Sequence, residues 1–341
     1  MKKIWILAGL FGLGGATGCL TDKPAVVSSR MIDPAELDRL FSAGRDPGEF
    51  FIHSHRDASG RSVFTGQNRM LPDSRAVLLF ESAAHSALPI VRATAPSGTD
   101  LLLLTDTTSQ QNWVNLDLKD RIGLIPIGPN RVGAIPAHVF DETPGYLSVL
   151  PSLDLDRMRV ESILFYARMA RQSLWPLHRH ADARDIQAVL GLEFLRGFAY
   201  VTWDFSTRMM TFSATDPFQP DSRAVLAELP VSFNADLGAI EVPCILDGVE
   251  TPVIFDSAGD YELALESPPM DLIRQIGFQD LVLRRVRAVT PQSVGLEPVE
   301  TPYLGTRLLR RFRVTLDNRR NVLWIESPDS AVRGEPSDET P

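Results

Sequence analysis

The sequence predicts a mainly β protein whose body consists of two similar lobes, preceded by a short N-terminal helix. Short apolar runs separated by glycine and proline are typical of strands, and the chain of 341 residues contains 23 glycines and 25 prolines. The clearest runs cover residues 50–52, 76–80, 90–94, 101–104, 201–205 and 314–316. A second observation predicts the two lobes: three segments of the first half recur, in the same order, in the second half.

Amino-acid composition, length and net charge limit the classes of protein to which this chain can belong. Hydrophobic residues make up 44% of the chain and charged residues 23%, which is typical of a globular protein and argues against wholesale disorder. Length alone favours about two domains. The net charge is −9, the wrong sign for a protein that binds phosphate backbones through a basic face, so no nucleic-acid partner is expected.

The N-terminus has the pattern of a secretory signal: two lysines, an apolar stretch over residues 4–13, and then small residues. Ala16-Thr17-Gly18-Cys19 resembles the bacterial lipobox. This resemblance implies that residues 1–18 are removed and that Cys19 carries the lipid. The chain would then be anchored in the bacterial cell envelope and face the periplasm, with Leu20 favouring the outer membrane. The alternative is plain signal cleavage beside an incidental cysteine.

The remaining chain divides into four predicted parts. Residues 19–48 form a tether and a short helix, which begins at Asp33-Pro34-Ala35-Glu36 and ends near Gly44. Residues 49–225 form the first lobe with its insertions, and residues 226–328 form the second. Residues 329–341 are polar and without periodicity, which predicts a disordered tail. Cys244 lies in an apolar run and is expected in the core.

The internal repeat is collinear, although its offset shrinks along the chain. Residues 103–107 match 253–257, residues 155–160 match 283–288, and residues 190–198 match 304–312. The corresponding offsets are 150 (Asp106 to Asp256), 128 (Leu155 to Leu283) and 114 (Leu190 to Leu304). In both copies an aspartate follows, Asp204 or Asp317, and then a last apolar strand. The first copy therefore carries the longer insertions.

Each copy has an apolar strand that runs into Asp-Thr or Asp-Ser and, later, two residues and a glycine that support this loop. The loops are Asp106-Thr107-Thr108-Ser109 and Asp256-Ser257-Ala258-Gly259, and the supporting segments are Val189-Leu190-Gly191 and Tyr303-Leu304-Gly305. Over residues 88–328 this pattern resembles the two-lobed bacterial aspartic proteases related to retroviral protease and pepsin. The resemblance implies two retropepsin-like β-barrel lobes, with Asp106 and Asp256 as the catalytic dyad and Thr107 and Ser257 bracing the loops.

Two carboxylates within hydrogen-bond reach share one proton, so one can activate water while the other protonates a carbonyl. The resemblance thus implies an endopeptidase that needs no cofactor. Thr108 and Ala258 stand where this family has glycine, a residue that allows close approach because it has no Cβ. The alternative is therefore an inactive relative whose cleft between the lobes binds a peptide or an envelope partner. A purely structural lipoprotein is a third possibility.

Two histidine pairs are candidate metal ligands. His53 with His55 and His178 with His180 have a spacing that places both imidazoles on one face of a strand. No cysteine accompanies them, so we expect no metal site. The expected partners are a peptide or protein and, through the lipid, a membrane; the oligomeric state is left open.

Overall fold

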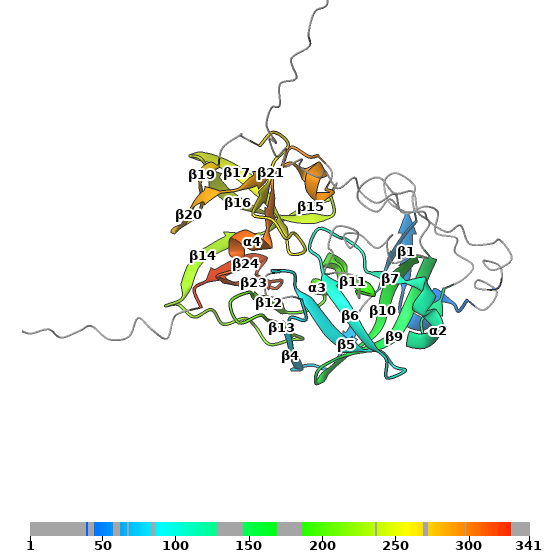
Figure 1. Cartoon of the computed structure of the whole chain (residues 1–341). Helices are drawn as coiled ribbons and strands as arrows, with labels where there is room; N and C mark the ends of the chain where they lie inside the picture. Colours follow the sequence, from blue (N-terminus) through cyan, green and yellow to red (C-terminus); the bar gives the residue numbers. More distant parts are fainter. Residues whose placement is uncertain are drawn as a thin grey trace, which may run out of the picture.

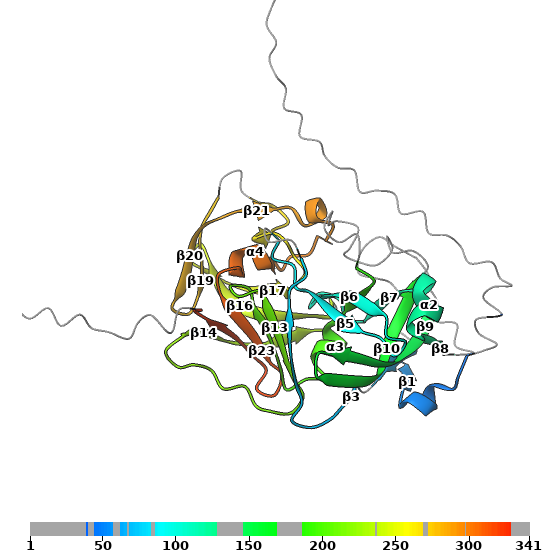
Figure 2. The same cartoon turned by 60° about the horizontal axis from the view of Figure 1, so that its bottom comes forward.

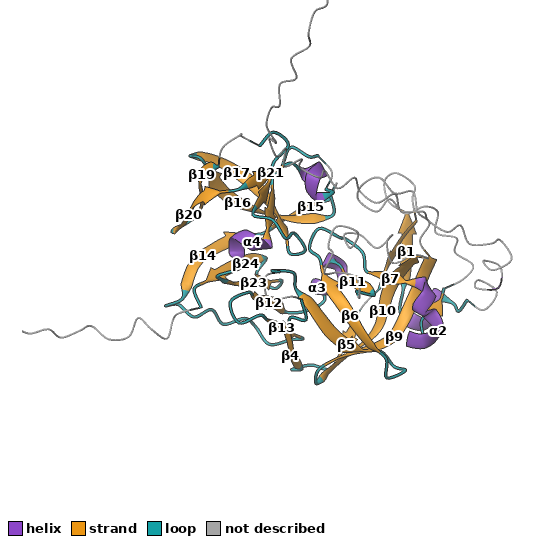
Figure 3. Ribbon diagram, viewed as in Figure 1, coloured by secondary structure: helices purple, strands orange, loops and turns teal. Residues whose placement is uncertain are grey.

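In the computed structural model, strands dominate both halves of the chain (Figures 1 and 3). The structure describes residue 39 and residues 44–56, 62–66, 68–82, 86–127, 146–168, 186–235, 237–268, 272–296 and 298–328. Two large sheets, one in each half, flank a six-stranded sheet to which both halves contribute. The mainly β architecture with two barrel-like lobes expected from the sequence is confirmed.

The sheet of the first lobe closes on itself. Its strand order is β3 (Arg69–Met70), β10 (Met158–Arg168), β7 (Trp113–Asn115), β11 (Ala188–Leu190), β6 (Asp100–Thr105), β5 (Ile90–Thr94), β9 (Tyr146–Leu155) and β8 (Ile125–Pro126). Because β9 also pairs with β10 over most of its length, the sheet forms a barrel-like layer. The short helices η2 (Leu116–Leu118) and α2 (Lys119–Ile122) follow β7.

The sheet of the second lobe repeats this plan with shorter connections. Its order is β20 (Leu281–Val286), β19 (Ile273–Phe278), β16 (Ala239–Leu246), β17 (Val249–Asp256), β22 (Tyr303–Gly305), β18 (Leu263–Ala264) and β21 (Ala288–Val289). β15 (Ser232–Asn234) also pairs with β16. The 3-10 helix η6 (Pro291–Val294) lies between β21 and β22.

The six-stranded sheet joins the lobes. Its order is β14 (Val225–Pro230), β24 (Val322–Glu326), β23 (Arg313–Asp317), β12 (Tyr200–Asp204), β13 (Met209–Ser213) and β4 (Arg75–Leu79). At its centre Thr202 pairs with Thr315, and their hydroxyl oxygens are 2.9 Å apart. Since these residues occupy equivalent places in the two copies, the pseudo-twofold axis that relates the copies passes close to this pair.

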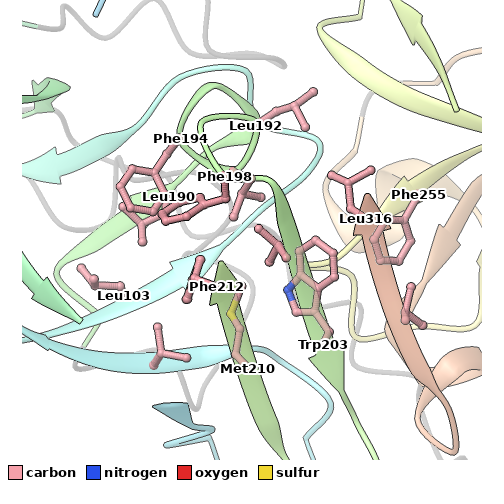
Figure 4. Packing of buried hydrophobic residues seen from close by; sticks show 14 of the residues in the cluster. Leu103, Leu190, Leu192, Phe194, Phe198, Trp203, Met210, Phe212, Phe255 and Leu316 are labelled. Atoms are coloured by element: carbon pink, nitrogen blue, oxygen red, sulfur yellow. The ribbon is translucent and has the colours of Figure 1, made fainter. Parts of the chain in front are cut away.

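The largest apolar cluster runs from one lobe through the six-stranded sheet into the other (Figure 4). Trp203 of β12 lies between the lobes in this cluster, and its ring meets that of Phe255 edge-on at 5.5 Å between centroids. Phe194, Phe198 and Phe212 form a second aromatic group, with centroids 4.9 to 6.3 Å apart. One continuous core therefore fixes the position of each lobe relative to the other.

The structure confirms two of the three repeat matches and corrects the other. The hairpin turn of β9 and β10 begins at Asp156 with φ 53°, and that of β19 and β20 begins at Gln279 with φ 52°. Six residues later, Ser162 and Arg285 both have φ 58°. Asp156 thus corresponds to Gln279, an offset of 123 residues instead of 128. The sequence match was wrong by five residues because a few apolar residues and one arginine can be aligned at more than one place along two such strands.

Residues 50–52 were also predicted wrongly as a strand. Asp46 caps a 3-10 helix, η1 (Pro47–Phe50): its side chain accepts a hydrogen bond from the Gly48 amide at 2.7 Å, and Glu49 reaches back to the Asp46 amide. Proline at the first position favours this helical start. The strands β1 (His53–Arg56) and β2 (Ser62–Thr65) then pair as a separate antiparallel two-stranded sheet.

Several predicted features lie outside the described residues: the signal segment, Cys19, most of the helix from Asp33 to Gly44, and the tail after residue 328. Arg39, the single described residue of that N-terminal segment, is helical. In the described ranges no helix has both the length and the apolar character that a membrane crossing requires.

Candidate functional site

The two aspartate loops meet at the junction of the lobes. Asp106 follows directly after β6, and Asp256 is the last residue of β17. Both strands pair in parallel with the short strand at the supporting glycine: β6 with β11, which ends just before Gly191, and β17 with β22, which ends at Gly305. The same local topology therefore delivers each carboxylate to the same place in its lobe.

Thr107 and Ser257 connect the loops by reciprocal hydrogen bonds. The Thr107 hydroxyl donates to the Phe255 carbonyl oxygen and accepts from the Ser257 amide at 3.0 Å. The Ser257 hydroxyl donates to the Thr105 carbonyl oxygen at 2.9 Å and accepts from the Thr107 amide at 3.1 Å. Both side chains are completely buried. Four hydrogen bonds thus hold the two lobes together at one point.

Both carboxylates accept hydrogen bonds from their own loops. Oδ1 of Asp106 accepts from the Thr108 amide at 2.8 Å and from the Thr108 hydroxyl at 2.7 Å. Oδ1 of Asp256 accepts from the Ala258 amide at 2.9 Å. The Thr108 side chain therefore turns toward its own aspartate, and the four bonds between the loops are intact beside it.

The second loop differs from the first because an aromatic residue reaches its aspartate. The Tyr261 hydroxyl donates to Oδ2 of Asp256 at 2.6 Å, and Tyr261 is buried. Gly259 makes room for this contact: a Cβ at Gly259 would lie 2.6 Å from Oδ2 of Asp256 and 2.6 Å from the tyrosine ring. At the repeat offset of 150 residues, the first copy has Ser109 and Gln111 in these places.

The site is nearly closed to solvent. Asp106 is 0% exposed and Asp256 is 2% exposed. The Ala258 methyl belongs to a buried apolar cluster of the first lobe that includes Leu104, Trp113 and Ile186. A methyl group in place of the glycine hydrogen therefore adds an apolar contact between the lobes.

The glycines of the two recurring Leu-Gly pairs, Gly191 and Gly305, lie close against the backbone of the loops that they support. A Cβ at Gly191 would lie 2.2 Å from the Gln111 carbonyl oxygen, and a Cβ at Gly305 would lie 2.2 Å from the Tyr261 carbonyl oxygen. The next residue of each copy donates its amide to the loop: Leu192 to the Ser109 carbonyl, Thr306 to the Gly259 carbonyl. These close approaches are possible only without a side chain. The short helices α3 (Leu192–Leu195) and α4 (Thr306–Leu309) follow.

Trp203 and Tyr261 are site residues that the sequence analysis missed. The Trp203 indole donates to the Thr105 hydroxyl at 3.0 Å, directly before Asp106, while its ring packs on Phe255, directly before Asp256. For Tyr261 the sequence did contain an indication, because the second copy has Gly259 and Tyr261 where the first copy has Ser109 and Gln111. Nothing in the sequence marked Trp203, because only the tertiary structure brings β12 beneath both loops.

The other candidates are placed as follows. No cluster of three metal-ligating side chains occurs among the described residues. His53 lies in β1, whereas His178 and His180 lie outside the described residues. Cys244 is a free, buried cysteine of β16, and burial raises the pKa of its thiol to about 12. This confirms its expected place in the core.

Comparison with known proteins corrects the family prediction. No family model matches the chain, and no curated protein matches it. Among solved structures it is similar to basic 7S globulin from soybean, with a TM-score of 0.49 and 13% identity over 75% of this chain and 95% of that one. It is similar to conglutin gamma, a basic 7S globulin from lupine seeds, with a TM-score of 0.48 and 12% identity over the same shares. Both of these structures are described as basic 7S globulins and no family model matches, so the predicted membership in the bacterial aspartic protease family is corrected: the comparisons assign this chain to no such family.

Proposed function

We propose that this chain is a binding protein without peptidase activity and that it holds an extended peptide segment of a partner at the junction of its two lobes. The observation that carries the proposal is the state of Asp256. Each of its carboxylate oxygens accepts a hydrogen bond from a buried group of its own lobe, the Ala258 amide or the Tyr261 hydroxyl. Asp256 is thus fixed within the contact between the two aspartate loops, residues 106–109 and 256–259, which we call the joint.

Peptide hydrolysis by two carboxylates requires a water molecule that contacts them and a proton that they exchange with the substrate. Here Asp106 is 0% exposed and Asp256 is 2% exposed, and three of the donors around them come from Thr108 and Ala258. These are the two positions at which a glycine was expected. The threonine adds a hydrogen bond within its own loop, and the alanine adds apolar contact with the other lobe.

The joint supports binding because it presents both lobes to one ligand. The two lobes meet at loops that directly follow β6 and β17, so a chain crossing the joint contacts residues of both copies. An extended peptide is the proposed ligand, since β-rich surfaces bind peptides through backbone hydrogen bonds and side-chain pockets. Rigid loops favour binding because little conformational entropy is lost when the ligand arrives.

The test uses a diverse peptide pool with the wild type and with the variants Asp106→Asn and Asp256→Asn. Mass spectrometry after incubation from pH 3 to pH 7 detects cleavage, and gel filtration of the same mixtures detects retained peptides. We expect no cleavage at any pH and retention of a subset of the pool by the wild type. Photo-crosslinking of a retained peptide is expected to label exposed residues of both lobes.

Two results contradict the proposal. Cleavage by the wild type that both asparagine variants abolish would establish a catalytic pair. Failure of the folded wild type to retain any peptide would remove the binding function. Circular dichroism and the urea midpoint of each variant provide the control for folding.

A further inference from the structure

A second surface lies far along the sheet from the aspartate loops, at strand β20. This strand is the outermost of its sheet and pairs only with β19 within the described residues. Figures 1 and 2 show it at the outer margin of the second lobe in both views. An edge strand presents unpaired backbone N–H and C=O groups, which form a template for a further strand.

The hairpin of β19 and β20 is strongly basic in an acidic protein. Residues 272–287 contain four arginines and a single acidic residue, Asp280, whereas the whole chain has a net charge of −9. Arg274, Arg284 and Arg285 are exposed. None of these three forms an ion pair within the described part of the chain. Their charge is therefore available to a partner.

An apolar strip borders Arg284 on one face of the sheet. Gly277 of β19 lies between Ile245 of β16 and Val282 of β20 in one row across the three strands. Ile245 is 42% exposed and Val282 is 48% exposed, with no side chain at Gly277 between them. Arg284 follows Val282 two residues along β20, so apolar and basic side chains alternate toward the same side.

We propose that an acidic, extended segment of a partner protein binds here by adding as a strand to β20. Its backbone pairs with the free edge, its carboxylates face the arginines, and its apolar side chains pack on Val282. A second copy of this chain is the less favoured occupant, because an antiparallel β20 pair would bring arginines opposite arginines. This site is independent of the one proposed between the lobes.

The probe is a labelled peptide of about eight residues, the length of an ordinary strand, in which glutamate and valine take turns at every second position and threonine fills the positions between, so that both kinds of side chain face the same side. Fluorescence anisotropy compares it with a glutamine counterpart and with a version N-methylated at alternate backbone amides. We expect the acidic peptide to bind about tenfold more tightly than the glutamine peptide, to lose affinity with added salt, and to protect β20 amides from hydrogen exchange. The N-methylated peptide should lose this binding, because it cannot complete the strand pairing.

The protein variants separate this site from general charge effects. Arg284→Gln with Arg285→Gln should weaken binding about tenfold, whereas Arg310→Gln with Arg311→Gln removes the same charge from exposed positions elsewhere and should leave affinity unchanged. Equal binding of the N-methylated peptide, or equal loss in the two double variants, would overturn the proposal. So would preferential binding to vesicles of phosphatidylglycerol, or a dimer that forms through β20.

Discussion

The Tyr261 hydroxyl donates a hydrogen bond of 2.6 Å to Oδ2 of Asp256, and both residues are buried. At Asp106 of the first lobe, Thr108 provides two donors, and Gln111 stands at the place equivalent to Tyr261. The two halves of the joint are therefore topologically equivalent and chemically different. Gly259 makes the difference possible, since a side chain there would occupy the space of the tyrosine ring.

Removal of the tyrosine hydroxyl should destabilise the protein. Tyr261→Phe deletes the bond to a buried carboxylate oxygen, for which we expect a loss of about 1–3 kcal/mol in the free energy of unfolding. The measurement is the urea midpoint near neutral pH. Tyr200→Phe is the matched control, because Tyr200 is 9% exposed and its hydroxyl has no hydrogen bond within the described residues. Equal losses in both variants would contradict the assigned role of the contact.

The bonds between the loops should act as one unit. Thr107→Val and Ser257→Ala each remove a hydroxyl that both donates and accepts across the joint, leaving buried backbone groups without these partners. We expect each to cost about 2–4 kcal/mol in the free energy of unfolding. The double variant should lose less than the sum of the two, by about 1 kcal/mol or more.

The control for this double-mutant cycle is Thr202→Val with Thr315→Val. This pair shares a single hydrogen bond in the middle of the six-stranded sheet and keeps its backbone ladder. Strict additivity at Thr107 and Ser257 would show that the two loops are stabilised independently.

Substitution of either supporting glycine should be severe. A Cβ at Gly191 or Gly305 would lie 2.2 Å from a backbone oxygen, and neither backbone oxygen can move without displacing its loop. We expect Gly191→Ala and Gly305→Ala to lower stability by more than about 3 kcal/mol or to prevent folding. Gly277→Ala is the comparison, since its Cβ meets only ordinary contacts at 3.7 and 3.8 Å. Soluble yield and thermal midpoints report the outcome, and a mild effect at Gly191 would refute the close-approach argument.

Stability should fall as pH rises from about 4.5 to about 7 because of Glu193. Burial raises the pKa of this carboxyl from 4.5 to about 7, despite a hydrogen bond from the Gly66 amide at 3.3 Å. The native state therefore retains a proton that the unfolded chain releases, and each proton bound only by the native state makes the free energy of unfolding decrease with pH.

The variant Glu193→Gln keeps an acceptor for Gly66 but cannot ionise. The free energy of unfolding of the variant minus that of the wild type should be larger at pH 8 than at pH 5. Urea midpoints of both proteins at the two pH values provide the comparison. If the difference between the two proteins is the same at both pH values, Glu193 does not titrate as assigned.

Two of the site's features were predictable from sequence because they repeat. Asp106 with Thr107 and Asp256 with Ser257 follow similar apolar strands, and Gly191 and Gly305 follow similar short ones. The structure places these segments in equivalent positions. The hairpin match failed because it was carried by a few apolar residues and one arginine, which can be aligned at more than one place along these strands. Backbone conformation, a positive φ at Asp156 and Gln279, identified the true correspondence.

By itself, the sequence determined the mainly β class, the duplicated architecture and the residues at the joint, because strand periodicity and a repeated loop are local properties of the chain. Only the tertiary structure decided what surrounds the aspartates. Trp203 of the six-stranded sheet donates a hydrogen bond to Thr105 beside Asp106, and Ala258 packs into the apolar cluster of the other lobe. Tyr261 reaches Asp256 only because Gly259 leaves the space that its ring fills. Such contacts depend on the shape and packing of segments distant in the sequence, which the pattern of residue types does not encode.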